Sequence, residues 1–183
     1  MTLFSFRSAA LALGLLAAAP AAWAQVGPGT QWTADGYGYR EVQDGAIVQL
    51  DARKPGKATT LVSKQQLTPA GQSEPLRVRR FELSGNGRRV LLNTNTKKVW
   101  RYDTRGDYWM YDLDKQQLTQ LGKGRPESSL MFAKFSPDGS RVAYVSEHNL
   151  FVENLADHAI TQLTQDGTDK LINGTSTGCM RRS

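Results

Sequence analysis

The sequence has almost none of the residues from which disulfides and metal centres are built. Among 183 residues there is one cysteine, Cys179, and there are two histidines, His148 and His158. A single cysteine cannot form an intrachain disulfide, and this set of residues does not make a zinc constellation. We therefore expect no cofactor and no bound metal.

Long apolar runs and helical periodicity are also scarce. The longest apolar stretch, Ala9–Ala19, is too short for a membrane-spanning helix, which needs about 20 residues. It follows Arg7 and precedes Ala22-Trp23-Ala24, an A-x-A pattern typical of signal-peptide cleavage. Residues 1–24 are therefore predicted to be a secretory signal peptide, with a retained N-terminal anchor as the alternative. We expect the mature chain to be periplasmic or secreted and to have no membrane span.

Negative charge is in deficit, with a formal net charge of +6 for the whole chain. The excess of lysine and arginine is concentrated between residues 77 and 105, a pattern that would suggest nucleic-acid binding in a cytosolic protein. In an exported protein we expect such residues to form solvated strand faces. Arg77 and Arg79 flank Val78, which would place both on one side of a strand. No nucleic-acid partner is predicted.

What the sequence does contain is a repeated turn. The clearest copy is Phe135–Val145, in which an apolar residue, a Ser-Pro-Asp-Gly turn and an alternating run follow one another. This order is typical of two antiparallel strands around a tight turn. Related copies begin at Trp32 and at Leu83, so the unit recurs every 51 to 52 residues.

The second half of the unit repeats as well. Leu113–Leu121 matches Leu155–Leu163, and the stretch from Leu50 to Leu61 is a looser copy. A fixed period of about 40 to 50 residues with strand patterns is in the range of propeller blades. The predicted fold is all-β, a partial β-propeller of about three blades. A β-sandwich with coincidental turns is the alternative, but it predicts no fixed period.

Three blades are fewer than the four to eight that close a ring. The chain therefore either oligomerises to close the ring or is part of something longer. An open arc leaves two terminal faces, so we expect apolar side chains to be exposed at both ends. The candidates are Ile47, Val48 and Leu50 at one end and Leu150, Phe151 and Val152 at the other.

The second copy carries about ten extra residues within Thr94–Gly106. Insertions in repeat proteins map to loops on one face, often the binding face. Trp100-Arg101-Tyr102 places a guanidinium between two aromatic residues, a combination suited to contact with a carbonyl or carboxylate. The alternative, equally weighted on composition, is that Arg101 ties the extra hairpin down through an ion pair with Asp103 or Asp107.

Several of these segments together resemble a known family. They are the run from Lys97 to Leu113, the turn at Phe135–Gly139, and the strands Arg141–Val145 and Asn149–Val152. The series is similar to the N-terminal propeller of dipeptidyl peptidase IV, in the prolyl oligopeptidase family of serine peptidases. The resemblance covers Leu76–Thr175.

The resemblance implies a propeller of eight blades followed by an α/β-hydrolase domain with Ser, Asp and His in that order. It implies removal of N-terminal dipeptides whose second residue is Pro or Ala, a peptide substrate, and a homodimeric parent protein. In this family an Arg that follows Trp at the start of the insertion contacts the carbonyl oxygen of the substrate. The resemblance assigns that substrate-binding role to Arg101.

Beyond Thr175 the sequence departs from the family pattern. The family continues with Asp-Trp-Val-Tyr and a pair of glutamates that hold the amino group of the substrate, whereas residues 176–183 are unrelated. We interpret residues 25–175 as the N-terminal part of the propeller and residues 176–183 as an aberrant tail, for which a frameshift is one explanation. The function expected is that of a truncated peptidase propeller without its catalytic domain. The alternative is a non-enzymatic periplasmic propeller that binds a partner protein.

No catalytic residue is assigned. Ser176 formally lies in a G-x-S-x-G pattern, the nucleophile elbow of α/β-hydrolases, but neither an acidic residue nor a histidine follows it. The two histidines have no identifiable nucleophile beside them. We interpret four aspartates as turn residues: Asp35, Asp138, Asp166 and Asp169.

Overall fold

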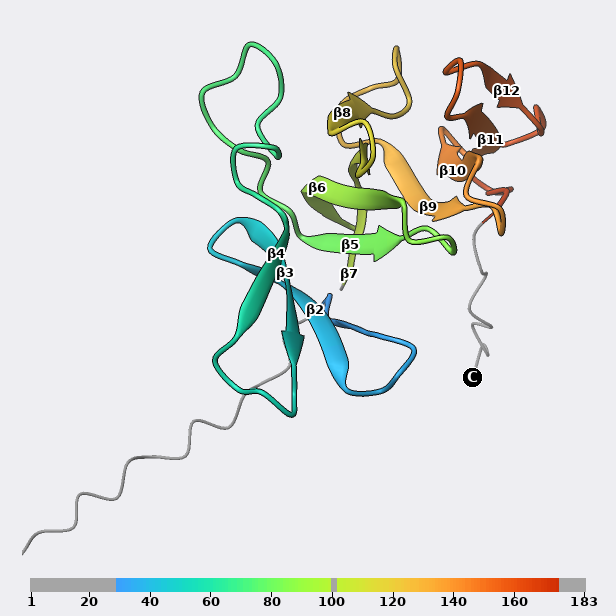
Figure 1. Cartoon of the computed structure of the whole chain (residues 1–183). Coiled ribbons are helices and arrows are strands. Elements are labelled where there is room, and N and C mark those ends of the chain that lie inside the picture. Colours follow the sequence, from blue (N-terminus) through green and yellow to red (C-terminus); the bar gives the residue numbers. More distant parts are fainter. Residues whose placement is uncertain (1–28, 100–101, 175–183) are drawn as a thin grey trace, which may run out of the picture.

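A computed structural model describes residues 29–99 and 102–174 (Figure 1). Its regular elements are strands, so the prediction of an all-β fold is confirmed. None of the described residues belongs to a helix long and apolar enough to cross a membrane. The predicted signal peptide (1–24), Arg101 and the tail (176–183) lie outside the described residues.

The strands form three antiparallel meanders of four, which are the three predicted blades. The first blade consists of β1 (Gln31–Trp32), β2 (Gly38–Gln43), β3 (Ala46–Asp51) and β4 (Ala58–Val62). The second consists of β5 (Arg80–Leu83), β6 (Arg89–Val99), β7 (Tyr102–Asp112) and β8 (Gln117–Gln120). The third consists of β9 (Leu130–Phe135), β10 (Arg141–Ser146), β11 (Asn149–Asn154) and β12 (Ile160–Gln162). Figure 1 shows the blades following one another in chain order.

The predicted turn has the same geometry in all three blades. Gly36, Gly87 and Gly139 have φ angles of 71°, 69° and 70°, a region that glycine enters without steric cost. The N–H of each glycine donates to the carbonyl three residues earlier, at 3.0, 2.8 and 2.8 Å. An aspartate or asparagine before each glycine accepts further bonds from the turn backbone. The repeat seen in the sequence is therefore a repeat of structure.

In the second half of the repeat, the match between Leu113 and Leu155 is confirmed, but the copy in the first blade is shifted from the predicted position. The N–H groups of Leu113 and Leu155 donate to carbonyls at the start of the preceding hairpin, at 2.9 and 3.0 Å. In the first blade the equivalent bond comes from Ala52, at 2.9 Å. The counterpart of Leu113 is therefore Ala52 and not Leu50. Because the first copy is less similar in sequence, its predicted alignment with the second copy differs from the structure by two residues.

Two apolar clusters fill the spaces between the blades. One lies between the first and second blades and contains Ile47, Val62, Leu67, Phe81, Val90, Leu92 and Tyr111. The other lies between the second and third blades and contains Leu91, Met110, Leu121, Leu130, Ala133, Val142, Tyr144, Phe151 and Leu155. Successive residues of β6 alternate between the clusters, because neighbouring side chains of a strand point to opposite faces.

The exposure predicted for the ends of the arc is wrong for three of the six residues. Ile47 is 0 % exposed, Val48 6 % and Phe151 1 %. Ile47 and Phe151 belong to the clusters between blades, because their strands turn those side chains inward. Leu50, Leu150 and Val152 are half-buried. On the outer side of the first blade, Leu50 is paired with Tyr39, and Tyr39 with Trp32, which is 56 % exposed.

The expected strand face around Val78 is also not formed. Arg77 and Arg79 are exposed, as predicted, but they lie in the connection between β4 and β5 and not in a strand. This connection contributes Leu67, which is 0 % exposed, to the first cluster. Packing of a few apolar residues therefore orders a long segment that has no regular hydrogen-bond ladder.

Asp138 provides a test of the turn through the pH dependence of stability. Hydrogen bonds from the Ser136 and Ser140 hydroxyls and from the Ser140 N–H hold the pKa of Asp138 well below its usual range. Because the folded-state pKa is lowered, the contribution of Asp138 is present above the unfolded pKa of about 3.9 and is lost as the pH falls through the folded value. Asparagine fits the turn, since Asn86 occupies the same place in the second blade.

We therefore expect Asp138→Asn to be less stable than the parent protein at pH 7, and the difference to shrink as the pH falls below about 4. Urea midpoints measured at several pH values between 7 and 2 would check this. The reverse change, Asn86→Asp, is the matched control and should add an acid-sensitive contribution. A gap between parent and Asp138→Asn that stays constant over this range would contradict the assignment.

Candidate functional site

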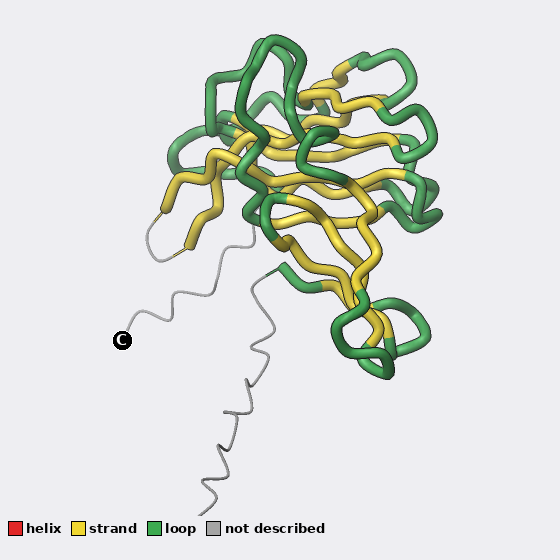
Figure 2. The backbone as a smooth tube through the Cα atoms, turned by 60° about the vertical axis from the view of Figure 1, so that its left-hand side comes forward, coloured by secondary structure: helices red, strands yellow, loops and turns green. Residues whose placement is uncertain are grey.

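The insertion in the second blade continues two strands of the sheet. Strands β6 and β7 are 11 residues each, and their pairing runs from Arg89 opposite Asp112 to Val99 opposite Tyr102. Register shifts occur on either side of Lys97. Figure 2 shows the pair of strands extending from the body of the protein to a grey tip. The insertion is therefore an extra hairpin, and it continues the sheet of the second blade.

The extended part of the hairpin is joined to the third blade. Arg105 and Gly106 of β7 pair with Met131 and Leu130 of β9, which merges the second and third blades into one eight-stranded sheet. A Cβ on Gly106 would lie 2.7 Å from the Asn93 Nδ2 and 2.8 Å from the Thr94 carbonyl oxygen. No side chain fits at this position, so glycine is required for the close approach of the strands.

A polar network fixes the base of the hairpin. The Asp107 carboxylate accepts hydrogen bonds from the Ser128 N–H at 2.7 Å and from the Asn95 amide at 2.8 Å. The Ser128 hydroxyl donates to the Asn95 carbonyl at 2.7 Å, and Asn95 also donates to Glu127 at 2.6 Å. These bonds anchor the hairpin through residues other than Arg101.

This network was only partly visible in the sequence. Asp107 accepts bonds from Ser128 and Asn95, and the predicted alternative of an ion pair between Asp107 and Arg101 falls on a residue outside the described part of the chain. Asn95 and Ser128 have positive φ angles of 44° and 53°. Asparagine tolerates this region, and that tolerance is the only local signal. The contact with Ser128 depends on tertiary structure.

Beside the network lies a groove of about 540 Å³. Its charged and polar lining residues are Lys97, Lys98, Arg105, Glu127, Ser128, Ser129, Glu147 and His148. Lys97 and Arg105 are opposite each other across the hairpin, a like-charge pair that a sheet normally avoids. Glu147 is already bonded to Arg125 at 2.9 Å, and His148 lies 3.6 Å from Asp169. The groove can therefore hold an electronegative group such as a carbonyl oxygen or a carboxylate.

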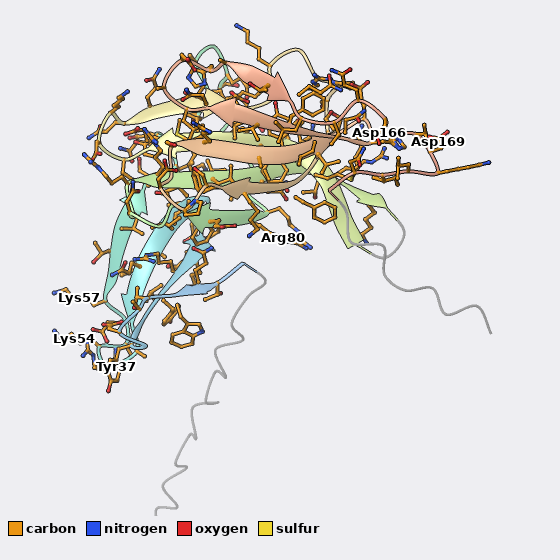
Figure 3. The ribbon with its side chains drawn as sticks, turned by 90° about the vertical axis from the view of Figure 1, so that its right-hand side faces the viewer. Tyr37, Lys54, Lys57, Arg80, Asp166 and Asp169 are labelled. Carbon is orange, nitrogen blue, oxygen red and sulfur yellow. The ribbon has the colours of Figure 1, made fainter. Side chains whose placement is uncertain are left out.

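The remaining sequence candidates have structural partners. Asp35 and Asp138 lie in the repeated turns, as predicted. Asp166 accepts a bond from Asn173 at 2.9 Å, and Figure 3 shows Asp166 and Asp169 near each other after the third blade. The His148 Nδ1 lies 2.9 Å from the Thr168 carbonyl oxygen.

His158 is likewise paired with another side chain. The His158 Nδ1 lies 3.4 Å from the Glu153 carboxylate, so this histidine is paired with an acid and not with a nucleophile. Among the described residues, no group of three His, Cys, Asp or Glu side chains could hold a metal ion. The hairpin, its anchor and the adjoining groove together form the candidate site.

The segment that contains this hairpin also carries the similarity to known proteins. Residues 84–177 match the family model of the dipeptidyl peptidase IV N-terminal region, which is more than half of the chain. The chain belongs to this family. The match begins at the turn of the second blade and includes the hairpin, its anchor and the whole third blade. The resemblance inferred from the sequence is thereby confirmed.

Individual relatives agree with the family match. A probable dipeptidyl-aminopeptidase B of Podospora anserina is 34% identical over 87 residues, covering 48% of this chain and 9% of the relative. One of Tuber melanosporum is 27% identical over 168 residues, covering 84% of this chain and 18% of the relative. The crystal structure of Porphyromonas gingivalis dipeptidyl peptidase 4 superimposes with a TM-score of 0.65 and 28% identity, over 78% of this chain and 20% of that chain. This chain spans less than a fifth of the length of the two dipeptidyl-aminopeptidase B relatives.

Proposed function

We propose that this chain is the substrate-facing part of the propeller of an exported serine dipeptidyl peptidase that removes N-terminal X-Pro or X-Ala dipeptides. The observation that carries the proposal is the anchored hairpin, which lies within the family match and whose sequence includes Trp100-Arg101-Tyr102. Family membership supports a peptide as the substrate. The parent protein is proposed to be a periplasmic or secreted homodimer.

In this proposal the chain positions the substrate and performs no bond cleavage. Acyl transfer by a serine, with histidine as general base, belongs to a hydrolase domain. Arg101 would donate hydrogen bonds to the carbonyl oxygen of the substrate. A guanidinium remains protonated at every pH of interest, because its pKa is above about 12, so it cannot take part in proton transfer. A rigid hairpin base favours this role, since a donor must be held in place to orient the substrate.

The proposal can be tested by comparing two proteins. The first is the purified 183-residue chain, which should not hydrolyse a Gly-Pro chromogenic substrate. The second is an extended protein, in which the sequence after residue 175 is read from the alternative reading frame of the gene. We expect this frame to encode Trp-Val-Tyr-Glu-Glu and, further on, a serine in a nucleophile elbow. The extended protein should hydrolyse the substrate. Activity of the 183-residue chain that is lost on Ser176→Ala would overturn the assignment of roles. An extension that encodes no such sequence would favour a non-enzymatic binding module.

A further inference from the structure

A second cavity, of about 320 Å³, lies beside the first strands of the three blades. Residues 29–31 of the first blade, β5 of the second and β9 of the third all contribute to its wall. The lining residues include Arg80, Leu91, Asn93, Tyr108, Phe132 and Lys134. Neither the repeated turns nor the hairpin anchor accounts for this cavity.

Its most unusual feature is the backbone at Phe132. This residue lies within β9 but has a φ angle of 54°, a region that a bulky side chain rarely enters. The pairing between β9 and β10 is irregular at the same place. The aromatic side chain is 47 % exposed although it belongs to an inner strand. The bulge therefore presents an aromatic surface at the cavity instead of burying it.

Two polar side chains of the wall, Asn93 and Arg80, are available for contact with a ligand. Asn93 is 7 % exposed, lines the cavity, and has its amide nitrogen beside Gly106. Arg80 is exposed, and Figure 3 shows its side chain projecting from the ribbon into open space. A ligand that accepts hydrogen bonds would take the place of water at both side chains.

The charges around the cavity favour an anionic group. Lys134 forms an ion pair with Glu82, so these two charges cancel, and the Arg80 charge remains. Burial raises the pKa of Tyr108, so its phenol stays neutral and can donate a hydrogen bond. Leu91 and the Phe132 ring supply apolar surface beside the polar groups. A guanidinium next to apolar surface suits a carboxylate attached to an apolar side chain.

We propose that this cavity binds the carboxyl end of a peptide whose last residue is apolar or aromatic. Arg80 would pair with the terminal carboxylate, Asn93 would bond to the last peptide group, and Phe132 would contact the last side chain. The inference rests on the proposed function in taking a peptide as the ligand, but it uses residues other than Arg101 and requires no catalysis.

The test is equilibrium dialysis of the 183-residue chain against isotopically labelled N-acetyl-Ala-Phe, a method that works for monomers and oligomers alike. The acetyl group removes the free amino terminus, so binding does not report on recognition of the N-terminus. Arg80→Gln should weaken binding by about tenfold or more, as should replacing the peptide carboxylate by an amide. Phe132→Gly suits the positive φ and should keep the fold while weakening binding several-fold.

Arg141→Gln is the matched control, because Arg141 is exposed on β10 and does not line the cavity. It should leave binding unchanged, and the thermal melt of each variant should match that of the parent protein. Absence of binding at 10 mM peptide, or equal binding of the acid and the amide, would overturn the proposal. Equally tight binding of an amidated peptide with a glutamate side chain would overturn its assignment to the terminal carboxylate. If the 183-residue chain binds the peptide but the extended protein shows no peptidase activity, the inference stands and the proposed peptidase function fails.

Discussion

Replacing Glu153 by alanine is expected to destabilise the protein by about 3 to 5 kcal/mol. Glu153 lies on β11 of the third blade and is 1 % exposed. One carboxylate oxygen accepts a hydrogen bond at 2.8 Å from the N–H of Gly122, which follows β8 of the second blade. The other lies 3.4 Å from the His158 Nδ1. Removing the carboxylate leaves a buried N–H without an acceptor and opens a cavity.

The effect is large relative to the total stability of a small domain, which is typically about 5 to 15 kcal/mol. Glu153→Gln is the informative partner, because it keeps an oxygen for the Gly122 N–H and should cost only about 1 to 2 kcal/mol. Glu74→Ala is an exposed control that should have little effect. Urea denaturation would measure all three. A change of less than about 1 kcal/mol for Glu153→Ala would show that the joint between the blades does not depend on this bond.

In the extended protein, Arg101→Ala is expected to lower kcat/KM by about 30- to 150-fold, which corresponds to roughly 2 to 3 kcal/mol. The reason is the loss of a charged donor to the substrate carbonyl. Stability should change little, because Asp107, Ser128 and Asn95 hold the base of the hairpin. Arg101→Lys should recover only part of the activity, since an ammonium cannot make the two parallel bonds of a guanidinium.

Steady-state kinetics with a Gly-Pro substrate and a thermal melt of the same samples would check this prediction. Arg88→Ala is a suitable control, because Arg88 is an exposed arginine of the same blade that pairs with Asp114, away from the hairpin tip. A marked drop in melting temperature, with unchanged kinetics of the remaining folded enzyme, would make Arg101 a structural residue.

The sequence by itself determined the all-β class, the period of the repeat and the place of the insertion. These features are local: a turn of this kind needs a residue such as Asp138 to accept bonds from its own backbone and a residue such as Gly139 to adopt a positive φ. Neither requirement depends on what the blade packs against. Turn chemistry repeated at a fixed spacing therefore indicated the architecture.

Only the tertiary structure decided which faces are buried and how the blades are joined. Whether Ile47 and Phe151 point inward depends on the register of each strand relative to the neighbouring blade, and a shift by one residue would reverse it. The anchor of the hairpin brings Asp107 together with Ser128, which lies 21 residues away. Such contacts form only when one blade packs on the next, so no local sequence pattern predicts them.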